Sequence, residues 1–190
     1  ADAGGASEIN DLSDAVTRSS GSSIGLGTGA LDAETGSSQE NIALGKDALT
    51  NATSGVRNLA IGVQALQSLA TSYDHIAIGN SALQNQTGGF ENVAIGRNAL
   101  ISSTSGYMNV AIAASAVDNL TTGNNNIGIG TQALDNLTTG TFNTAIGVRA
   151  LGQGLTTSSY NVGLGANAGR YVSGANNVAV GYESLSANGN

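Results

Sequence analysis

A nine-residue phrase, repeated ten times at nearly constant spacing, is the feature that most constrains the fold of this chain. One copy is Asn92–Leu100, with the sequence Asn-Val-Ala-Ile-Gly-Arg-Asn-Ala-Leu. Six of the nine steps between successive copies are identical in length, and the other three differ from them by a single position. The copies begin at Ser23, Asn41, Asn58, His75, Asn92, Asn109, Asn126, Asn143, Asn161 and Asn177. Such a short, regular period predicts a stack of equivalent coils.

Each copy alternates large and small residues, which is typical of a short β-strand with two different faces. We number the first residue of the phrase as position 0. Positions +1 and +3 are large and aliphatic (Thr144 is an exception), position +2 is Ala or Gly, and position +4 is Gly in all copies except at Ala113. We expect the aliphatic face to point into the coil together with the aliphatic residue at +8. We expect the small-residue face to lie against the backbone of another chain.

The period of about 17 residues predicts one coil of a β-solenoid, because helical repeats need about 33 residues and leucine-rich repeats about 20–29. The fold class expected is therefore all-β, a parallel β-solenoid (β-roll) of about ten 17-residue coils over residues 23–190. Coils stacked at about 4.8 Å would make a rod roughly 45 Å long. Positions +5 to +11 fit either a second strand or a helical turn. Three aliphatic anchors per coil do not offset the entropy of ordering the whole coil, which favours an oligomer.

Residues 1–22 precede the repeats and have a different pattern. Ile9, Leu12 and Val16 have the spacing of a heptad seam, which predicts a short helical coiled-coil stalk that joins several chains. The alternative is a flexible linker, because three apolar positions do not stabilise an isolated helix.

Composition excludes several classes of function. The net charge of −7 argues against a nucleic-acid partner, because little positive charge is available to neutralise phosphates. No apolar run approaches the length of a membrane-spanning helix, so we expect no membrane insertion. The chain has no cysteine, which removes disulfides, thiolate nucleophiles and Cys-type zinc sites. We expect no cofactor, no metal site and no catalytic residue.

The phrase Asn-h-Ala-h-Gly, where h is aliphatic, as in Asn92–Gly96, resembles the head repeats of trimeric autotransporter adhesins. The longer segment Asn126–Gly140, with the sequence Asn-Ile-Gly-Ile-Gly-Thr-Gln-Ala-Leu-Asp-Asn-Leu-Thr-Thr-Gly, is similar to repeats of phage tail fibres, which often precede a self-cleaving chaperone domain. The resemblance covers residues 23–190. It implies a parallel homotrimeric β-solenoid, left-handed if it follows the adhesin heads, in a fibre that contacts a host surface. The coil of the adhesin heads is shorter than the coil expected here.

Stacking converts each sequence position into a column along the rod. At position 0 we expect a structural ladder of amide hydrogen bonds. His75 takes an Asn position, and we expect it to be a hydrogen-bonding substitute rather than a ligand or a base. The ladder comprises Asn41, Asn58, Asn92, Asn109, Asn126, Asn143, Asn161 and Asn177.

Aromatic residues gather near position +15. Tyr73, Phe90 and Tyr107 occupy that position on adjacent coils, and Phe142 and Tyr160 fall close to the same corner. Rings about 5 Å apart, the spacing of stacked strands, can form a platform for the sugar rings of a glycan receptor. They can equally shield a turn or pack against a neighbouring chain. These five residues are the candidate binding site for a host-surface glycan or protein.

Two further columns have chemical interpretations that we weigh against structural ones. Asp118 and Asp135 stack at +9, a separation typical of retaining glycosidases or of a cation site, although exposed charges are the simpler interpretation. A threonine column at +12 suits either ice binding or hydroxyl-to-backbone bonds that stabilise the turn. Its members are Thr53, Thr87, Thr104, Thr121 and Thr138.

The leading functional hypothesis is a structural and adhesive segment of a viral tail fibre, located in the virion and attached to other fibre or virion proteins. The second is a bacterial surface adhesin or an extracellular filament subunit. The third is a polysaccharide-degrading tailspike. The partners expected are two copies of the chain itself and a host-surface receptor.

Overall fold

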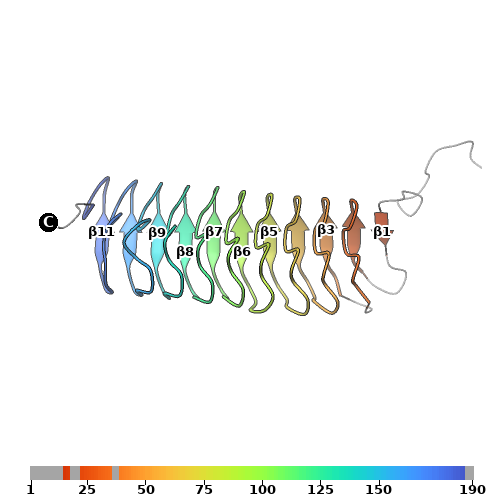
Figure 1. Ribbon diagram of the computed structural model, residues 1–190. Coiled ribbons are helices and arrows are strands. Elements are labelled where there is room, and N and C mark those ends of the chain that lie inside the picture. Colours follow the sequence, from red (N-terminus) through yellow and green to blue (C-terminus); the bar gives the residue numbers. More distant parts are fainter. Residues whose placement is uncertain (1–14, 18–21, 36–38, 187–190) are drawn as a thin grey trace, which may run out of the picture.

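The computed structural model describes residues 15–17, 22–35 and 39–186, and over these residues the chain is a parallel β-solenoid without helices (Figure 1). Eleven three-residue strands form one sheet in sequence order. Figure 1 shows them side by side along the rod, from β1 in red to β11 in blue. Their bounds are β1 Ala15–Thr17, β2 Ile24–Leu26, β3 Ile42–Leu44, β4 Leu59–Ile61, β5 Ile76–Ile78, β6 Val93–Ile95, β7 Val110–Ile112, β8 Ile127–Ile129, β9 Thr144–Ile146, β10 Val162–Leu164 and β11 Val178–Val180.

Strands β2–β11 pair in parallel, and equivalent repeat positions face each other. Val93 of β6, for example, pairs with Val110 of β7, and Ala94 pairs with Ala111. The nine turns of chain between these ten strands confirm the predicted β-solenoid and its period. Strand β1 differs because it pairs antiparallel with β2 and covers the edge of the first coil.

The segment from +4 to +8 is a tight turn, neither a second strand nor a helix. Gly96, at +4, has φ 138°, and the residues at +6 and +8 are left-handed, as at Asn98 (φ 60°) and Leu100 (φ 51°). Hydrogen bonds within and between coils hold this conformation: the Ala99 amide donates to the Gly96 carbonyl at 3.3 Å, and the Leu100 amide donates to the Ala116 carbonyl at 3.1 Å. Each coil is thus stabilised mainly by its neighbours in the stack.

The core is a narrow column of small and medium side chains inside the coil. It contains the Ala or Gly at +2, the Ala at +7, the Leu at +8 and the residue at +11. The leucine at +8 projects toward the small residue at +2: a Cβ placed on Gly163 would lie 2.7 Å from Cγ of Leu151. Leucines at +11 are further core residues that were not predicted, although the repeated Asn-Leu-Thr-Thr-Gly motif was a signal for them. They are Leu69, Leu120 and Leu137, with Leu155 at the equivalent place in the longer coil.

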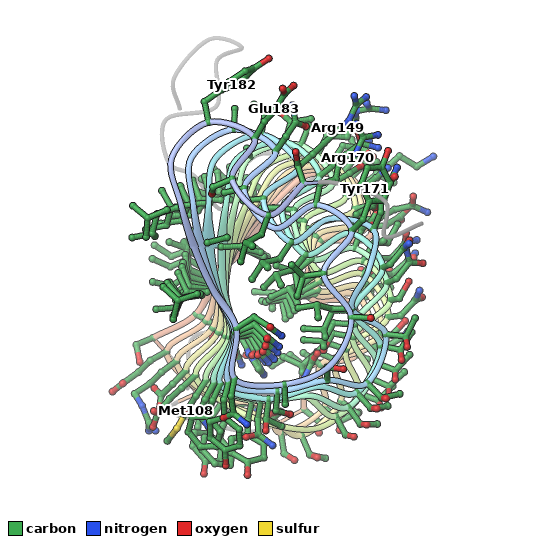
Figure 2. The ribbon with its side chains drawn as sticks, turned by 90° about the vertical axis from the view of Figure 1, so that its left-hand side faces the viewer. Met108, Arg149, Arg170, Tyr171, Tyr182 and Glu183 are labelled. Atoms are coloured by element: carbon green, nitrogen blue, oxygen red, sulfur yellow. The ribbon has the colours of Figure 1, made fainter. Side chains whose placement is uncertain are left out.

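The predicted orientation of the strand faces is wrong. The small residues at +2 are buried inside the coil, and the large aliphatic residues at +1 and +3 point outward. Ala43 is 0% exposed, for example, whereas its neighbour Ile42 is 39% exposed. The reason is steric, because the leucine at +8 already fills the interior. Viewed along the rod, Figure 2 shows carbon-only side chains projecting from the outside of the sheet and a column of polar side chains inside the coil.

The helical stalk predicted for residues 1–22 lies mostly outside the described residues. Where the structure describes the chain there, at Ala15–Thr17, it forms strand β1.

Candidate functional site

The asparagine column at position 0 is a buried, directional ladder. Asn109 donates its backbone N–H and its side-chain Nδ2 to Oδ1 of Asn92, at 2.9 and 3.1 Å. Asn109 Nδ2 also donates to the Gly123 carbonyl of its own coil at 2.9 Å. The same contacts between successive asparagines recur along the rod, with interruptions at His75 and at the first coil. Asn161 and Asn177 differ in that Nδ2 also donates to a carbonyl two residues upstream, of Ser159 and Ala175. The predicted structural role of these asparagines is therefore supported by their contacts.

The first coil replaces the missing asparagine with two other groups. Asn41 donates its backbone N–H to Ser23 Oγ at 3.0 Å and its Nδ2 to Glu34 Oε1 at 3.0 Å. Ser23 Oγ donates to the same carboxylate oxygen at 2.8 Å. Glu34 and Ser23 are both buried, so they form a polar cap at the start of the ladder.

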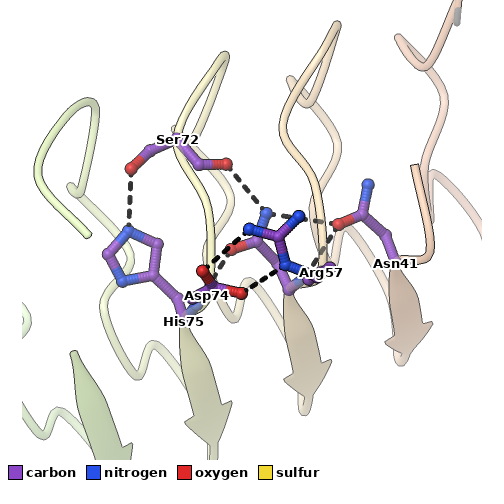
Figure 3. A network of polar contacts seen from close by, with 6 residues as sticks. Asn41, Arg57, Ser72, Asp74 and His75 are labelled. Atoms are coloured by element: carbon purple, nitrogen blue, oxygen red, sulfur yellow. Dashed lines mark hydrogen bonds and ion pairs between the residues drawn. The ribbon is translucent and has the colours of Figure 1, made fainter. Parts of the chain in front are cut away.

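His75 occupies the ladder without breaking it (Figure 3). Its backbone N–H donates to Asn58 Oδ1 at 3.0 Å, and its Nδ1 accepts the Asn92 backbone N–H at 3.3 Å. Since Nδ1 is an acceptor, the neutral ring carries its proton on Nε2, which donates to Ser72 Oγ at 3.1 Å. Ser72 Oγ then donates to the Gly89 carbonyl, the acceptor that an asparagine at position 75 would reach directly.

Burial keeps this histidine neutral. The ring is 0% exposed, and burial lowers its pKa from 6.5 to about 4, although the nearby Asp74 carboxylate opposes the shift. Both ring nitrogens are used in structural hydrogen bonds. These contacts suit the predicted role as a substitute within the ladder, and they leave no lone pair for a metal.

The aromatic candidates form two stacks at one corner of the rod, the aromatic corner. In the first, the ring centroids of Tyr73 and Phe90 are 5.5 Å apart and those of Phe90 and Tyr107 are 5.0 Å apart, with interplanar angles of 6° and 19°. In the second, Phe142 and Tyr160 are 5.3 Å apart and nearly parallel. The structure thus brings the five predicted site residues together in two groups. Within a stack, each ring covers a face of its neighbour.

Arg57 closes the first stack at its N-terminal end. Its guanidinium lies 5.9 Å from the centroid of the Tyr73 ring, in a cation–π contact. Two hydrogen bonds, of 2.7 and 2.9 Å, hold the guanidinium against the Asp74 carboxylate. This contact lowers the pKa of Asp74 and raises the pKa of Arg57. Arg57 was not among the predicted site residues, although it directly precedes the asparagine of its coil.

Phe142 and Tyr160 belong to a column one residue further along than Tyr107. This column, directly before position 0, is left-handed in each coil, as at Phe142 (φ 56°), Tyr160 (φ 61°) and Met108 (φ 55°). Phe142 and Tyr160 are 49% and 58% exposed, and Met108 is also exposed. Met108 therefore adds an apolar side chain to the aromatic corner that was not predicted from the sequence.

The outward residues at +1 and +3 form a second candidate surface, the aliphatic face. They are half-buried in most coils and become more exposed at β11, where Val178 and Val180 are 64% and 63% exposed. Nineteen of the twenty positions are Ile, Leu or Val, and the exception is Thr144. A continuous apolar stripe of this kind on the surface is typical of an interaction site.

Asp118 and Asp135 occupy equivalent places on adjacent coils. The pKa of Asp118 is raised to about 7, first by partial burial and then by the hydrogen bond and negative charge of Asp135. Asn119 Nδ2 donates to Asp118 Oδ1 at 3.2 Å and to the Asp135 carbonyl at 2.8 Å. Asp118 therefore changes its protonation state near neutral pH.

The threonine column uses its hydroxyls within the stack. Thr104 Oγ1 donates to the Thr121 carbonyl at 3.2 Å, and Thr121 Oγ1 donates to the Thr138 carbonyl at 3.0 Å. These bonds match the hydroxyl-to-backbone interpretation of the column.

Among residues 15–17, 22–35 and 39–186, no group of three or more His, Asp or Glu residues is placed to hold a metal ion. The same part of the chain contains no helix long and apolar enough to cross a membrane.

Comparison of the chain with protein-family models, with curated proteins and with solved structures finds no match.

Proposed function

We propose that this chain is a structural and adhesive segment of a viral tail fibre, in which three copies associate through the aliphatic face. The observation that carries the proposal is the in-register row of outward Ile, Leu and Val residues along β2–β11. Association of these rows would remove apolar surface from water at about 25 cal/mol per Å². The resemblance of the repeat to tail-fibre and adhesin repeats supports a trimer and a role in host attachment.

The position of the aliphatic face changes the assembly expected from sequence. The small-residue face is filled by the coil's own leucines, so copies would meet through the large side chains instead. This leaves the other sides of each coil, including the aromatic corner, at the perimeter of the assembly. Receptor contact and attachment to other fibre or virion proteins would use these outer sides.

A bacterial surface adhesin built from the same repeat is the second candidate, and it shares the proposed assembly. An extracellular filament that grows by end-to-end stacking is less favoured, because β1 pairs antiparallel with β2 and occupies the edge on which a further parallel coil would stack. A polysaccharide-degrading tailspike is third. Its candidate carboxylates are Asp118, whose pKa is raised to about 7, and Asp135 at the equivalent place on the next coil.

Light scattering on the purified chain tests the assembly. We expect a mass near three times 18.7 kDa. Replacing Ile95 and Ile112 with Lys should reduce the mass to that of one chain, with the circular dichroism spectrum retained. The matched control is Ser105→Lys, which adds the same kind of charge at an exposed turn. A monomeric wild-type chain, or equal effects of the two changes, would contradict the proposed interface.

Host attachment needs a separate measurement. The fluorescently labelled trimer should bind to bacterial cells and compete with intact virions for the same sites. Absence of binding to any bacterial surface would argue against an adhesive role, while leaving the assembly intact.

A further inference from the structure

The aromatic corner is interrupted at one coil by two adjacent asparagines. Asn124 follows Tyr107 in the first aromatic column, and Asn125 precedes Phe142 in the second. Asn125 Nδ2 donates to Asn124 Oδ1 at 2.8 Å. Both asparagines are half-buried. A pair of carboxamides therefore separates the two ring stacks.

The stacking contacts determine which ring faces point toward this pair. Phe90 covers the N-terminal face of Tyr107, so the opposite face of Tyr107 points toward the coil of Asn124. Tyr160 covers the C-terminal face of Phe142, so the other face of the Phe142 ring points toward the coil of Asn125. The two aromatic faces thus lie in adjacent columns and flank the asparagine pair diagonally, while Met108 precedes Asn125 and Thr141 follows Asn124 in the same columns.

The distance between Tyr107 and Phe142 along the rod suits a six-membered sugar ring. Tyr107 and Phe142 lie two coils apart, which is roughly 10 Å along the rod at the usual strand spacing. A pyranose chair in van der Waals contact with an aromatic group on each side needs about 8–9 Å. The asparagine side chains end at their δ atoms, whereas the rings of Tyr107 and Phe142 extend two or three bonds further. Longer side chains on both sides of these shorter carboxamides favour a notch in this corner, with the carboxamides as its floor.

The polar groups at this notch also suit a sugar. A carboxamide offers two N–H donors and two acceptor lone pairs, and the bond between Asn124 and Asn125 uses one of each. The remaining capacity matches hydroxyl groups, which both donate and accept. Glu91 lies in the column of Asn125, as do Asp74 and the Arg57 that pairs with it, and the chain has a net charge of −7, so an acidic sugar would be repelled.

We propose that the notch formed by Tyr107, Asn124, Asn125 and Phe142 binds one neutral hexopyranose residue of a host-surface glycan. The apolar C–H faces of the sugar pack on the two rings, and its hydroxyls bond to the carboxamides. This inference rests on the proposed function, because it names the receptor class that an adhesive segment would recognise.

Saturation-transfer NMR on the full chain provides the test, with the methyl β-glycosides of glucose, galactose and N-acetylglucosamine as probes and the methyl glycoside of sialic acid as the acidic comparison. At least one neutral glycoside should receive saturation at its ring protons, and the acidic one should not. The variants Tyr107→Leu and Phe142→Leu should each reduce the signal at least fivefold, and the Asn124→Ala, Asn125→Ala double variant should do the same.

The matched control is Tyr171→Leu, which removes a tyrosine ring outside the aromatic corner, where the Arg170 guanidinium lies 5.0 Å from the ring centroid. It should leave sugar binding unchanged. Equal losses in Tyr171→Leu and Tyr107→Leu would overturn the proposal, as would absence of signal from every neutral probe. A lower mass of Tyr107→Leu in light scattering would also overturn it, by assigning the corner to chain association. Binding of the trimer to cells without any sugar signal would reject the notch and leave the proposed function standing.

Discussion

Lowering the pH from 8 to 5 should destabilise the solenoid through His75, because its ring is neutral and fully buried in the folded chain. The pKa of His75 is about 4 when folded, against 6.5 for an ordinary histidine. Since the folded pKa is lowered, the unfolded chain binds more protons between these values. Stability is therefore complete above pH 6.5 and declines as the pH falls toward 4.

The size of this effect follows from the two pKa values. At pH 5 the unfolded histidine is almost fully protonated, whereas the folded one is about one-tenth protonated. Protonation of His75 therefore lowers the folding equilibrium constant at pH 5 by a factor of about 30, or about 2 kcal/mol of unfolding free energy. The loss approaches about 3 kcal/mol below pH 4. A loss of about 2 kcal/mol changes the ratio of folded to unfolded chain about 30-fold.

The assay is urea denaturation followed by circular dichroism at fixed protein concentration, at pH 8, 6.5 and 5, for the wild type and His75→Asn. The substitution restores asparagine to the ladder and removes the titrating ring, so other ionisable groups cancel in the comparison. The wild type should lose about 2 kcal/mol more than the variant between pH 8 and pH 5. The same pH dependence in both proteins would refute the structural assignment of His75 as a buried neutral base.

Three further predictions concern substitutions within the coils, the first of them with a control variant. Gly96→Val should destabilise the fold by about 3 kcal/mol or more in thermal or urea unfolding, because φ is 138° and a Cβ would collide with the Ala113 carbonyl. The control Arg97→Ala changes an exposed side chain and should alter stability by less than about 0.5 kcal/mol. Equal melting of the two variants would disprove the assigned packing. Asn109→Ala should cost about 3 kcal/mol in the same assay, since the buried Gly123 carbonyl loses its partner, and a cost below about 1 kcal/mol would contradict the ladder. Asp118→Asn should stabilise the chain by about 1 kcal/mol at pH 8 and have little effect at pH 4, because the raised pKa of Asp118 lowers stability as the pH rises through about 7 and solvent screening weakens the effect. A pH-independent effect would contradict the raised pKa of Asp118.

The repeat itself predicted much of this fold. Its constant period and the alternation from +1 to +3 specify a strand in each coil and the register between coils. The Asn column also followed from the sequence, because identical polar residues at the same place in each coil must stack. The burial of the residue at +8 was also predicted, because this position is aliphatic in nearly all copies.

The aromatic site was predictable only in part. The spacing of Tyr73, Phe90 and Tyr107 placed them on adjacent coils, but it did not show that their rings cover one another's faces. That arrangement depends on side-chain rotamers and on the Arg57 guanidinium, and it changes which surfaces are open to a ligand. The sequence also did not predict that Ser72 connects the His75 ring to the Gly89 carbonyl, because this contact joins two coils.

Alternation by itself determined that each strand has a large and a small face, and the tertiary structure decided which of them is inside. Rotating a strand by half a turn about its axis exchanges its two faces, and an alternating pattern fits either orientation, so the pattern does not show which face is buried. The inward face is determined by the left-handed turn from +4 to +8, which brings leucines such as Leu100 and Leu151 into a narrow interior. Only Ala or Gly fits opposite them, and the larger Ile, Leu and Val side chains are therefore left on the outside.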